Sequence, residues 1–521
     1  MDAKTLQFDR RSLMWGVAGA SLAGGLVVPT DARANYGRPF RRSDLPKDLM
    51  AHPQIRGRPT QERFWAQVRE AFPLPPRDQY YHYNTGTTGS QPFYSINNLA
   101  TYNIYKSNDP VFWEANLAQD ASADLFEIPT GASSAIGDKQ AQIAEMYGAN
   151  ADEVVLDYNT TDGLIMIFAG IKWGPDDRIV TTNMEHAAGQ GPIAWARDVF
   201  GVKVSVVDIP FDGSFKLSVE EFVNLFASAL SAPLPSGGKQ FLLVSHISFR
   251  SGIVMPVAEL TALAHSKANT WVIVDSAHGW GQLPIDCHGT GADFIAGAGH
   301  KWLCGGPGTG IVYIRNSSGT YPVAPFNYPS EGWGDFFTVP SRNYNAHPRP
   351  ASTYQARGEF NRPAVYAMAD SARFYNYIGL QNIYNRGLDL AAYLQKKIVN
   401  RWGPTALWID PSVDRRFKGF VTTFNPFRTL TDSASFATMN AAFAKIVSNL
   451  GGANNPVVNP SGKPPIYLAA RNWANHNSDG ASNRCCLRIS THAMYCSNEE
   501  TDYVFDQIVK QVDATGLPQL P

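Results

Sequence analysis

The sequence contains little cysteine and no surplus of either charge. The cysteines, five among 521 residues, are Cys287, Cys304, Cys485, Cys486 and Cys496. Their odd number and their spacing argue against a disulfide framework and against a zinc site. The formal net charge is −1, so no global field attracts nucleic acid or an anionic membrane surface. With 44% hydrophobic and 17% charged residues, the composition is typical of a globular protein of two or three domains.

The sequence also lacks an apolar run long enough to suggest a membrane-spanning helix. The stretch from Leu13 to Val28 contains four glycines and is shorter than the about 20 residues that spanning requires. Arg10 and Arg11 precede it, and a small-residue cleavage site follows at 32–34. The paired arginines resemble a twin-arginine signal. Residues 1–34 are therefore predicted to be a cleaved signal peptide that the twin-arginine translocon exports to the periplasm, without stable membrane insertion; an ordinary secretory signal is the alternative.

An alternation of strand and helix patterns organises the rest of the chain. Residues 35–82 predict an extended N-terminal arm with a helix near 61–71. Residues 83–335 alternate short apolar runs with helical stretches, which is typical of a mostly parallel sheet sandwiched by helices. Residues 336–521 predict an interface loop, a helical region over 363–402 and a smaller C-terminal α+β domain. The expected strands of the large α/β domain are 153–157, 178–182, 202–208, 240–245, 271–274, 294–296 and 310–315.

A first chemical motif is Asp275 in Trp-Val-Ile-Val-Asp-Ser-Ala-His-Gly (271–279). An aspartate at the carboxyl end of a buried strand lies where open α/β sheets bind their ligands. A carboxylate in such a place suits the pyridine nitrogen of pyridoxal 5′-phosphate (PLP), because a protonated ring withdraws electrons better. A helix N-cap is the alternative for an aspartate considered alone.

A second motif is Lys301 in Gly-His-Lys-Trp (299–302). It follows Asp275 by about one strand–helix–strand unit. A lysine that bonds covalently to a carbonyl needs a sheltered site, where desolvation lowers its pKa. The two motifs at this spacing predict a PLP site in which Lys301 holds the cofactor and Asp275 faces the ring nitrogen.

Three segments together resemble the class V aminotransferase superfamily of fold-type I PLP enzymes. They are V-D-S-A-H-G at 274–279, G-H-K-W at 299–302 and L-R-I-S-T-H-A-M-Y at 487–495. The resemblance extends from about residue 83 to 513, and its motif style is nearest the isopenicillin N epimerase-like branch. It implies PLP as cofactor, a fold-type I architecture and a homodimer.

The resemblance also implies roles for further residues. Thr160 and Thr161 match the family's phosphate-binding turn, a place where a helix N-terminus favours an anion; a capping turn is the alternative. His186 matches the histidine that stacks on the pyridine ring. On the same resemblance it is predicted to be a catalytic residue. His278 and His300 are expected to contact the cofactor. Asn84 belongs to a segment, 83–89, that resembles the opening loop over the active site, and it is expected to contact the substrate.

Arg488 lies between apolar residues in a strand-like run, where an arginine is rarely buried without a partner. By resemblance it binds the substrate's α-carboxylate, which a guanidinium can hold with two parallel hydrogen bonds. An internal salt bridge is the alternative.

Two positions depart from the family pattern. Phe249 stands where the family has Asn or Ser near the phenolate oxygen of the cofactor, and Ser248, Arg250 or His246 could substitute. Glu359 stands in place of the threonine that reaches the phosphate from a partner subunit, so that role is not carried over. Arg357 remains a candidate for the phosphate or for a second substrate carboxylate.

The reaction is predicted mainly by exclusion. Once released from the cofactor, Lys301 is the natural base for the α-proton of an amino acid. No cysteine occurs over 466–483, where a desulfurase requires a mobile thiol. We therefore expect an aminotransferase-type reaction on an amino acid or on an amino-acid side chain of a secreted peptide metabolite. Epimerase or lyase chemistry, and a non-catalytic periplasmic binding protein on a degenerate scaffold, are the alternatives.

Overall fold

The computed structural model describes residues 55–76, 79–119, 139–210, 214–315, 360–428, 433–451, 464–473 and 484–521. The predicted leader (1–34), the loop over 320–355, Arg357 and Glu359 lie outside these residues. Within the described part, no helix is both long and apolar enough to cross a membrane.

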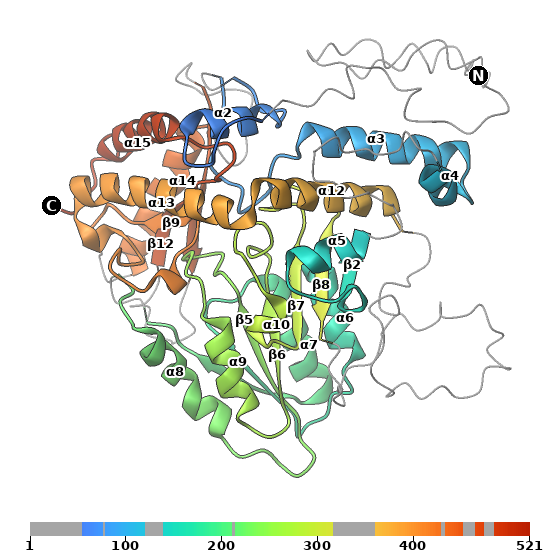
Figure 1. Cartoon of the computed structure of the whole chain (residues 1–521). Helices are drawn as coiled ribbons and strands as arrows, with labels where there is room; N and C mark the ends of the chain where they lie inside the picture. Colours follow the sequence, from blue (N-terminus) through green and yellow to red (C-terminus); the bar gives the residue numbers. More distant parts are fainter. Residues whose placement is uncertain are drawn as a thin grey trace, which may run out of the picture.

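A seven-stranded sheet in the order β2-β8-β7-β6-β5-β3-β4 forms the centre of the molecule (Figure 1). Neighbouring strands from β7 to β4 pair in parallel, whereas β8 is antiparallel to both β7 and β2. This confirms the predicted mostly parallel α/β sheet. Its strands are β2 (Val154–Asp157), β3 (Arg178–Thr182), β4 (Lys203–Val207), β5 (Gln240–Ser245), β6 (Thr270–Asp275), β7 (Phe294–Ala298) and β8 (Gly310–Ile314).

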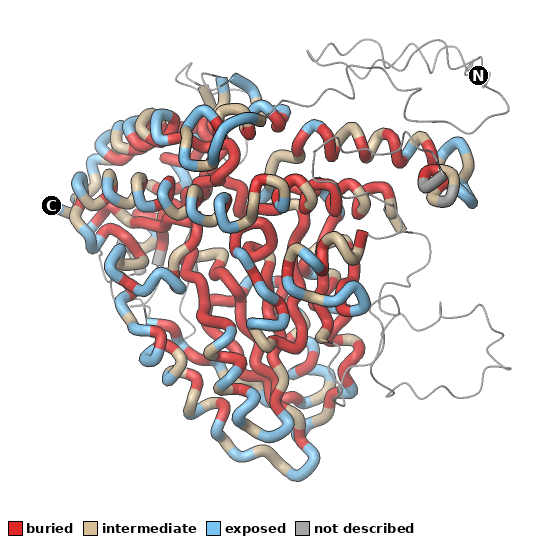
Figure 2. Tube along the Cα trace, viewed as in Figure 1, coloured by how far each residue is buried: buried red, intermediate tan, exposed pale blue. Residues whose placement is uncertain are grey.

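Both faces of this sheet are covered, because successive side chains of a strand point to opposite sides. In β5, Phe241 and Leu243 pack into one apolar cluster, whereas Leu242 and Val244 pack into the other. Figure 2 shows the resulting buried interior. Helices α6 (Thr160–Gly170) and α7 (Ala187–Phe200) cover the first face. The second face lies under α5 (Lys139–Met146), α8 (Val219–Ser231), α9 (Val257–His265) and α12 (Arg362–Ile378), and the short α10 (Cys287–Thr290) precedes β7.

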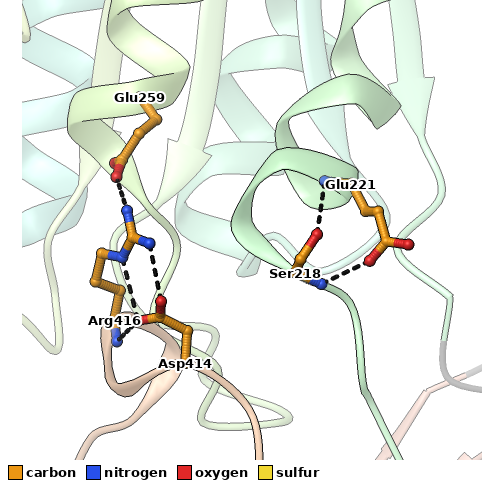
Figure 3. A network of polar contacts seen from close by, with 5 residues as sticks. All are labelled: Ser218, Glu221, Glu259, Asp414 and Arg416. Atoms are coloured by element: carbon orange, nitrogen blue, oxygen red, sulfur yellow. Dashed lines mark hydrogen bonds and ion pairs between the residues drawn. The ribbon is translucent and has the colours of Figure 1, made fainter.

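Helix α8 illustrates how local sequence sets these elements. Ser218 caps it, and Ser218 and Glu221 exchange two hydrogen bonds of 3.2 and 2.8 Å (Figure 3). This capping box satisfies backbone donors that would otherwise lack partners. Phe222, Phe226 and Leu230, four residues apart, then place one buried stripe against the sheet.

Three further helices belong to the N-terminal part, and α3 lies along α12 (Figure 1). They are α2 (Glu62–Glu70), α3 (Phe93–Asn108) and α4 (Trp113–Gln119). Buried Asp370 on α12 links α3 to α5. It accepts a hydrogen bond of 2.6 Å from Tyr102 of α3 and one of 2.7 Å from Lys139 of α5.

The C-terminal unit is a three-stranded antiparallel sheet in the order β11-β12-β9, packed with helices. It consists of α13 (Leu380–Trp402), β9 (Val421–Phe424), α14 (Ser433–Asn449), β11 (Ala469–Trp473), β12 (Arg484–Ser490) and α15 (Asn498–Asp513). The short β1 (Tyr81–His82) pairs in parallel with β10 (Ile466–Tyr467) and so ties the N-terminal arm to this unit. The single helical region predicted over 363–402 is two helices, because the chain turns at Gly379, whose φ is +90°.

Candidate active site

A cavity of about 490 Å³ opens beside the carboxyl ends of the parallel strands. Its walls come from loops that follow β2, β3, β5, β6 and β7, from the opening loop at 86–87 and from the C-terminal sheet. This is the edge at which open α/β sheets bind ligands. The lining includes Thr160, Thr161, His186, Phe249, His278, His300, Lys301, Arg471 and Arg488.

Lys301 lies shortly after β7 and faces this cavity. Burial lowers the pKa of its amine to about 8, with Asp275 opposing that shift and the positive charges of Arg488 and Arg471 adding to it. The backbone carbonyl of the preceding His300 accepts a hydrogen bond of 2.9 Å from the amide of Gly89. The opening loop is thus fixed against the segment that presents the lysine.

His278 determines whether the Lys301 amine faces a hydrogen-bond donor or an acceptor. Its Nδ1 accepts a hydrogen bond of 3.1 Å from the indole N–H of Trp302, which can only donate. Burial keeps the pKa of His278 well below its usual range, so the ring is neutral and its proton lies on Nε2. That atom lies 3.5 Å from Lys301 Nζ. An N–H that points at an amine favours the neutral, nucleophilic form of Lys301.

Asp275 ends β6 and is buried. Its Oδ1 accepts a hydrogen bond of 2.9 Å from the amide of Ala277. Burial raises the pKa of this carboxyl, and the charge of Lys301 opposes the rise. The two residues of the predicted pair therefore lie close enough to influence each other, and Ser245 and Ala296 flank Asp275 on the neighbouring strands.

The turn before α6 offers polar atoms without partners. Asn159 caps the helix by accepting from the amide of Asp162 at 3.0 Å, so Thr160 is free of the capping role. Within the described structure, Thr160 Oγ1 and His300 Nδ1 are buried and make no hydrogen bond. A side chain at Gly310 would come within 2.7 Å of the Asn159 backbone nitrogen, so this turn depends on glycine. An unpartnered hydroxyl at the N-terminus of α6 and an unpartnered ring nitrogen of His300, which follows β7, fit a phosphate group.

His186 and Phe249 form one wall of the cavity. The ring of His186 contacts Phe249 edge to face, with the centroids 4.7 Å apart. Its Nδ1 accepts from the amide of Ala188 at 3.1 Å. The pKa of His186 falls to about 4, first because of burial and then because of nearby cations, so the ring is neutral. Phe249 lines the cavity as expected and brings no hydrogen-bonding group to it.

Arg488 is buried, and the described acids form no salt bridge with it, which removes support for the internal salt bridge considered from the sequence. Its guanidinium donates to the Phe249 carbonyl at 2.8 Å and to Asn84 Oδ1 at 2.9 Å. Burial lowers its pKa to about 9. Asn84, predicted to contact the substrate, lies against Arg488 and orients it.

The cavity includes an arginine that the sequence analysis missed. Arg471 of β11 and Arg488 of β12 lie on the same face of the antiparallel pair, because Arg471 is opposite Cys486 and Arg488 is opposite Ala469. The alternation Ala469-Ala-Arg471 could have indicated this only if the strand register had been known. Thr87 was also missed; its hydroxyl lies 3.3 Å from Arg488 and 3.4 Å from Arg471.

The five cysteines are all described, and each is buried. None of them belongs to the described lining of the cavity. Burial raises the pKa of the Cys304 thiol to about 12, so it is not a reactive thiolate. Among the described residues, no group of His, Cys, Asp and Glu side chains could hold a metal ion.

The fold and this site define a PLP-dependent enzyme of fold-type I. A lysine amine of lowered pKa, a buried carboxyl group and unpartnered polar atoms of Thr160 and His300 suit the aldehyde, the ring nitrogen and the phosphate of that cofactor. Residues 118–435 match the aminotransferase class-V family, and this chain belongs to it. Membership and the fit of the site assign PLP as the cofactor.

Comparisons with individual proteins support the same family. The chain is 26% identical over 263 residues to a probable cysteine desulfurase of Methanothermobacter thermautotrophicus, an alignment covering 49% of this chain and 60% of that protein. It is 26% identical over 341 residues to probable cysteine desulfurase 2 of Mycobacterium leprae, covering 62% of this chain and 73% of the relative. The structure of a cystine C–S lyase in complex with cysteine persulfide has a similar fold, with a TM-score of 0.60, 17% identity and coverage of 85% and 98%.

Proposed function

We propose that this protein is a PLP-dependent enzyme that removes the α-proton of an amino acid and transfers its amino group. The observation that carries the proposal is the placement of Lys301 and Arg488 in one cavity, with Asp275 beside the lysine. The guanidinium holds an α-carboxylate, which brings the α-carbon toward the lysine amine.

The chain's own residues supply binding and proton transfer. Bound here, PLP supplies an aldehyde that combines with amino groups and a ring that withdraws electrons from the α-carbon. Asp275 holds a proton at the ring nitrogen. Lys301, whose pKa is about 8, accepts and returns a proton near neutral pH. Asn84 orients Arg488, and Phe249 excludes water from one wall of the cavity.

Carbon–sulfur bond cleavage is a second candidate reaction, and the names of the related proteins favour it. An enzyme-bound cysteine as sulfur acceptor is not supported, because the described lining of the cavity contains no cysteine. Elimination without such a cysteine releases the sulfur as a thiol or sulfide, and hydrolysis with water gives ammonia and a keto acid from the same substrate. Transamination instead releases a keto acid without ammonia and needs a second keto acid to accept the amino group. Epimerisation returns the amino acid with altered configuration.

These reactions are separated by incubating the purified holoenzyme with single amino acids. Ammonia release indicates elimination, loss of the visible cofactor band with keto-acid formation indicates transamination, and a change in optical rotation alone indicates epimerisation. Lys301→Ala is expected to remove the visible band. Lys216→Ala is the control, because that lysine is exposed and its ion pair among the described residues is with Asp410. A wild-type protein without a Lys301-dependent band would contradict the proposal and favour a non-catalytic binding protein.

We also propose that the protein is exported to the periplasm and that it forms a homodimer. The paired arginines and the cleavage site of residues 1–34 support export by the twin-arginine translocon to the periplasm. A peptide metabolite carrying an amino-acid side chain is a substrate class available there, consistent with an isopenicillin N epimerase-like enzyme. Replacing Arg10 and Arg11 by lysine should leave the uncleaved protein in the cytoplasm. The proposed homodimer is tested by light scattering of the holoenzyme.

A further inference from the structure

Arg471 brings a positive charge to the cavity that no described acid offsets. Among the described residues, its guanidinium donates to the Ala470 carbonyl at 2.9 Å and to the Thr87 hydroxyl at 3.4 Å. Its Nε is buried and makes no hydrogen bond within the described structure. The described lining of the cavity contains no aspartate or glutamate.

Two other arginines of the molecule, Arg416 and Arg250, have acidic partners. Arg416, on the surface, binds Glu259 at 2.6 Å and Asp414 at 2.8 Å (Figure 3). Arg250, near the cavity, is stabilised by the charge of Glu185, which raises its pKa against the effect of burial. Arg471 and Arg488 differ from both, since the described chain supplies neither with a carboxylate.

Arg471 and Arg488 lie close together and carry like charges. Each points a nitrogen at the hydroxyl of Thr87, and the charge of Arg471 lowers the pKa of Arg488. Like charges held together in a partly buried site are unfavourable until anions bind. Arg488 has its guanidinium fixed by Asn84 and the Phe249 carbonyl, which suits the single α-carboxylate of a substrate.

Arg471 also lines a second hollow. This space of about 450 Å³ shares His186, Phe249 and Arg471 with the first cavity and continues toward Asn440 and Ala444 of α14. Arg471 therefore lies where the two spaces meet, at the part of the first cavity that continues toward α14. A group bound there belongs to the distal end of the substrate.

We propose that the substrate is an amino acid whose side chain carries a second acidic group, and that Arg471 binds this group. The inference rests on the proposed function and specifies the substrate class of the same site. A carboxylate is the simplest such group, because it can accept two hydrogen bonds from one guanidinium.

The test compares glutarate with its monoamide, which bind without reacting, on the holoenzyme by isothermal titration calorimetry. The wild-type protein should bind the diacid about 10-fold or more tightly than the monoamide, the usual effect of one charged hydrogen-bonded pair. Arg471→Gln should reduce the ratio of the two dissociation constants to about 1, and Arg471→Lys should keep part of the preference. Arg416→Gln, the surface control, should keep the whole of it. Circular dichroism confirms that each variant is folded.

Two results would overturn the inference. One is equal binding of both ligands by the wild-type protein. The other is an equal loss of affinity for both ligands in Arg471→Gln, because Arg471 would then share the first carboxylate with Arg488. These outcomes are distinct from failure of the proposed function, which is measured by the Lys301-dependent cofactor band and not by ligand selectivity.

Discussion

Lys301 titrates in surroundings unlike those of a surface lysine. Its pKa of about 8 lies below the usual value near 10.5, mainly because burial disfavours the charged form. Only the neutral amine attacks an aldehyde, so its fraction rises as the pH rises through 8. We predict that the rate at which PLP attaches to the apoprotein increases up to about pH 9 and then levels off. Stopped-flow absorbance measures this rate, and a rate still rising beyond pH 10 would show an unperturbed lysine.

The carboxyl group of Asp275 lowers the folding stability of the apoprotein, although the function of the holoenzyme requires it. Its pKa is raised by burial, so the ionised form destabilises the fold at any pH above the folded-state pKa. Asp275→Asn removes this cost and keeps an acceptor for the Ala277 amide. We predict that the apoprotein variant is more stable at pH 7 by on the order of 1 kcal/mol, and that this gain shrinks as the pH falls and the wild-type carboxyl becomes protonated.

The same substitution should reduce turnover by about 10²-fold or more, because the ring nitrogen loses its charged partner. Urea denaturation of the apoprotein and steady-state kinetics of the holoenzyme measure the two effects separately. A variant that was less stable without cofactor, or fully active with it, would contradict the role assigned to this aspartate.

At the scale of elements, helix α13 depends on one glycine for its contact with the site. A Cβ at Gly387 would overlap the buried ring of Phe420. Phe420 in turn packs edge to face on Trp302, at 5.7 Å between centroids, next to Lys301. Gly387→Ala should therefore destabilise the protein by about 1–3 kcal/mol despite the better helix propensity of alanine.

The matched control for this substitution is Gly191→Ala in α7. Apart from its chain neighbours and the backbone of α7, nothing lies within 4 Å of a Cβ placed at Gly191. The crowding of that Cβ by the following Pro192 opposes the gain in helix propensity, so this variant should change the stability by less than about 1 kcal/mol. Chemical denaturation compares the two. Equal effects would mean that the contact between α13 and Phe420 does not limit stability.

Elements and the central chemical pair were predictable from local patterns. The strands Arg178–Thr182 and Gln240–Ser245 were predicted with the bounds that the structure has, because short apolar runs between turn residues identify buried strands. The place of Arg471 and the contact of Asn84 with Arg488 were not predictable in this way. Both depend on tertiary pairing, namely the register of β11 against β12 and the approach of the opening loop to Arg488, which no local pattern encodes.

Three parts of the molecule meet at the cavity. The opening loop, the edge of the large sheet and the C-terminal sheet each contribute to its lining, so a ligand bound there links all three. A ligand that binds only the folded state stabilises it by about 2.7 kcal/mol at 100 times its dissociation constant. PLP should accordingly raise the melting temperature of the apoprotein, and hydrogen exchange should slow in all three parts.

Pyridoxal, which lacks the phosphate, is the ligand that tests where this stabilisation comes from. It can still reach Lys301 and Asp275, but it leaves Thr160 Oγ1 and His300 Nδ1 without the partners that they lack in the described structure. Its effect on the melting temperature at equal concentration should therefore be smaller than that of PLP. Thr160→Val should narrow the difference between the two ligands, since it removes one of the two groups proposed to bind the phosphate. Differential scanning calorimetry provides the comparison, and equal shifts for both ligands would place the phosphate away from the N-terminus of α6.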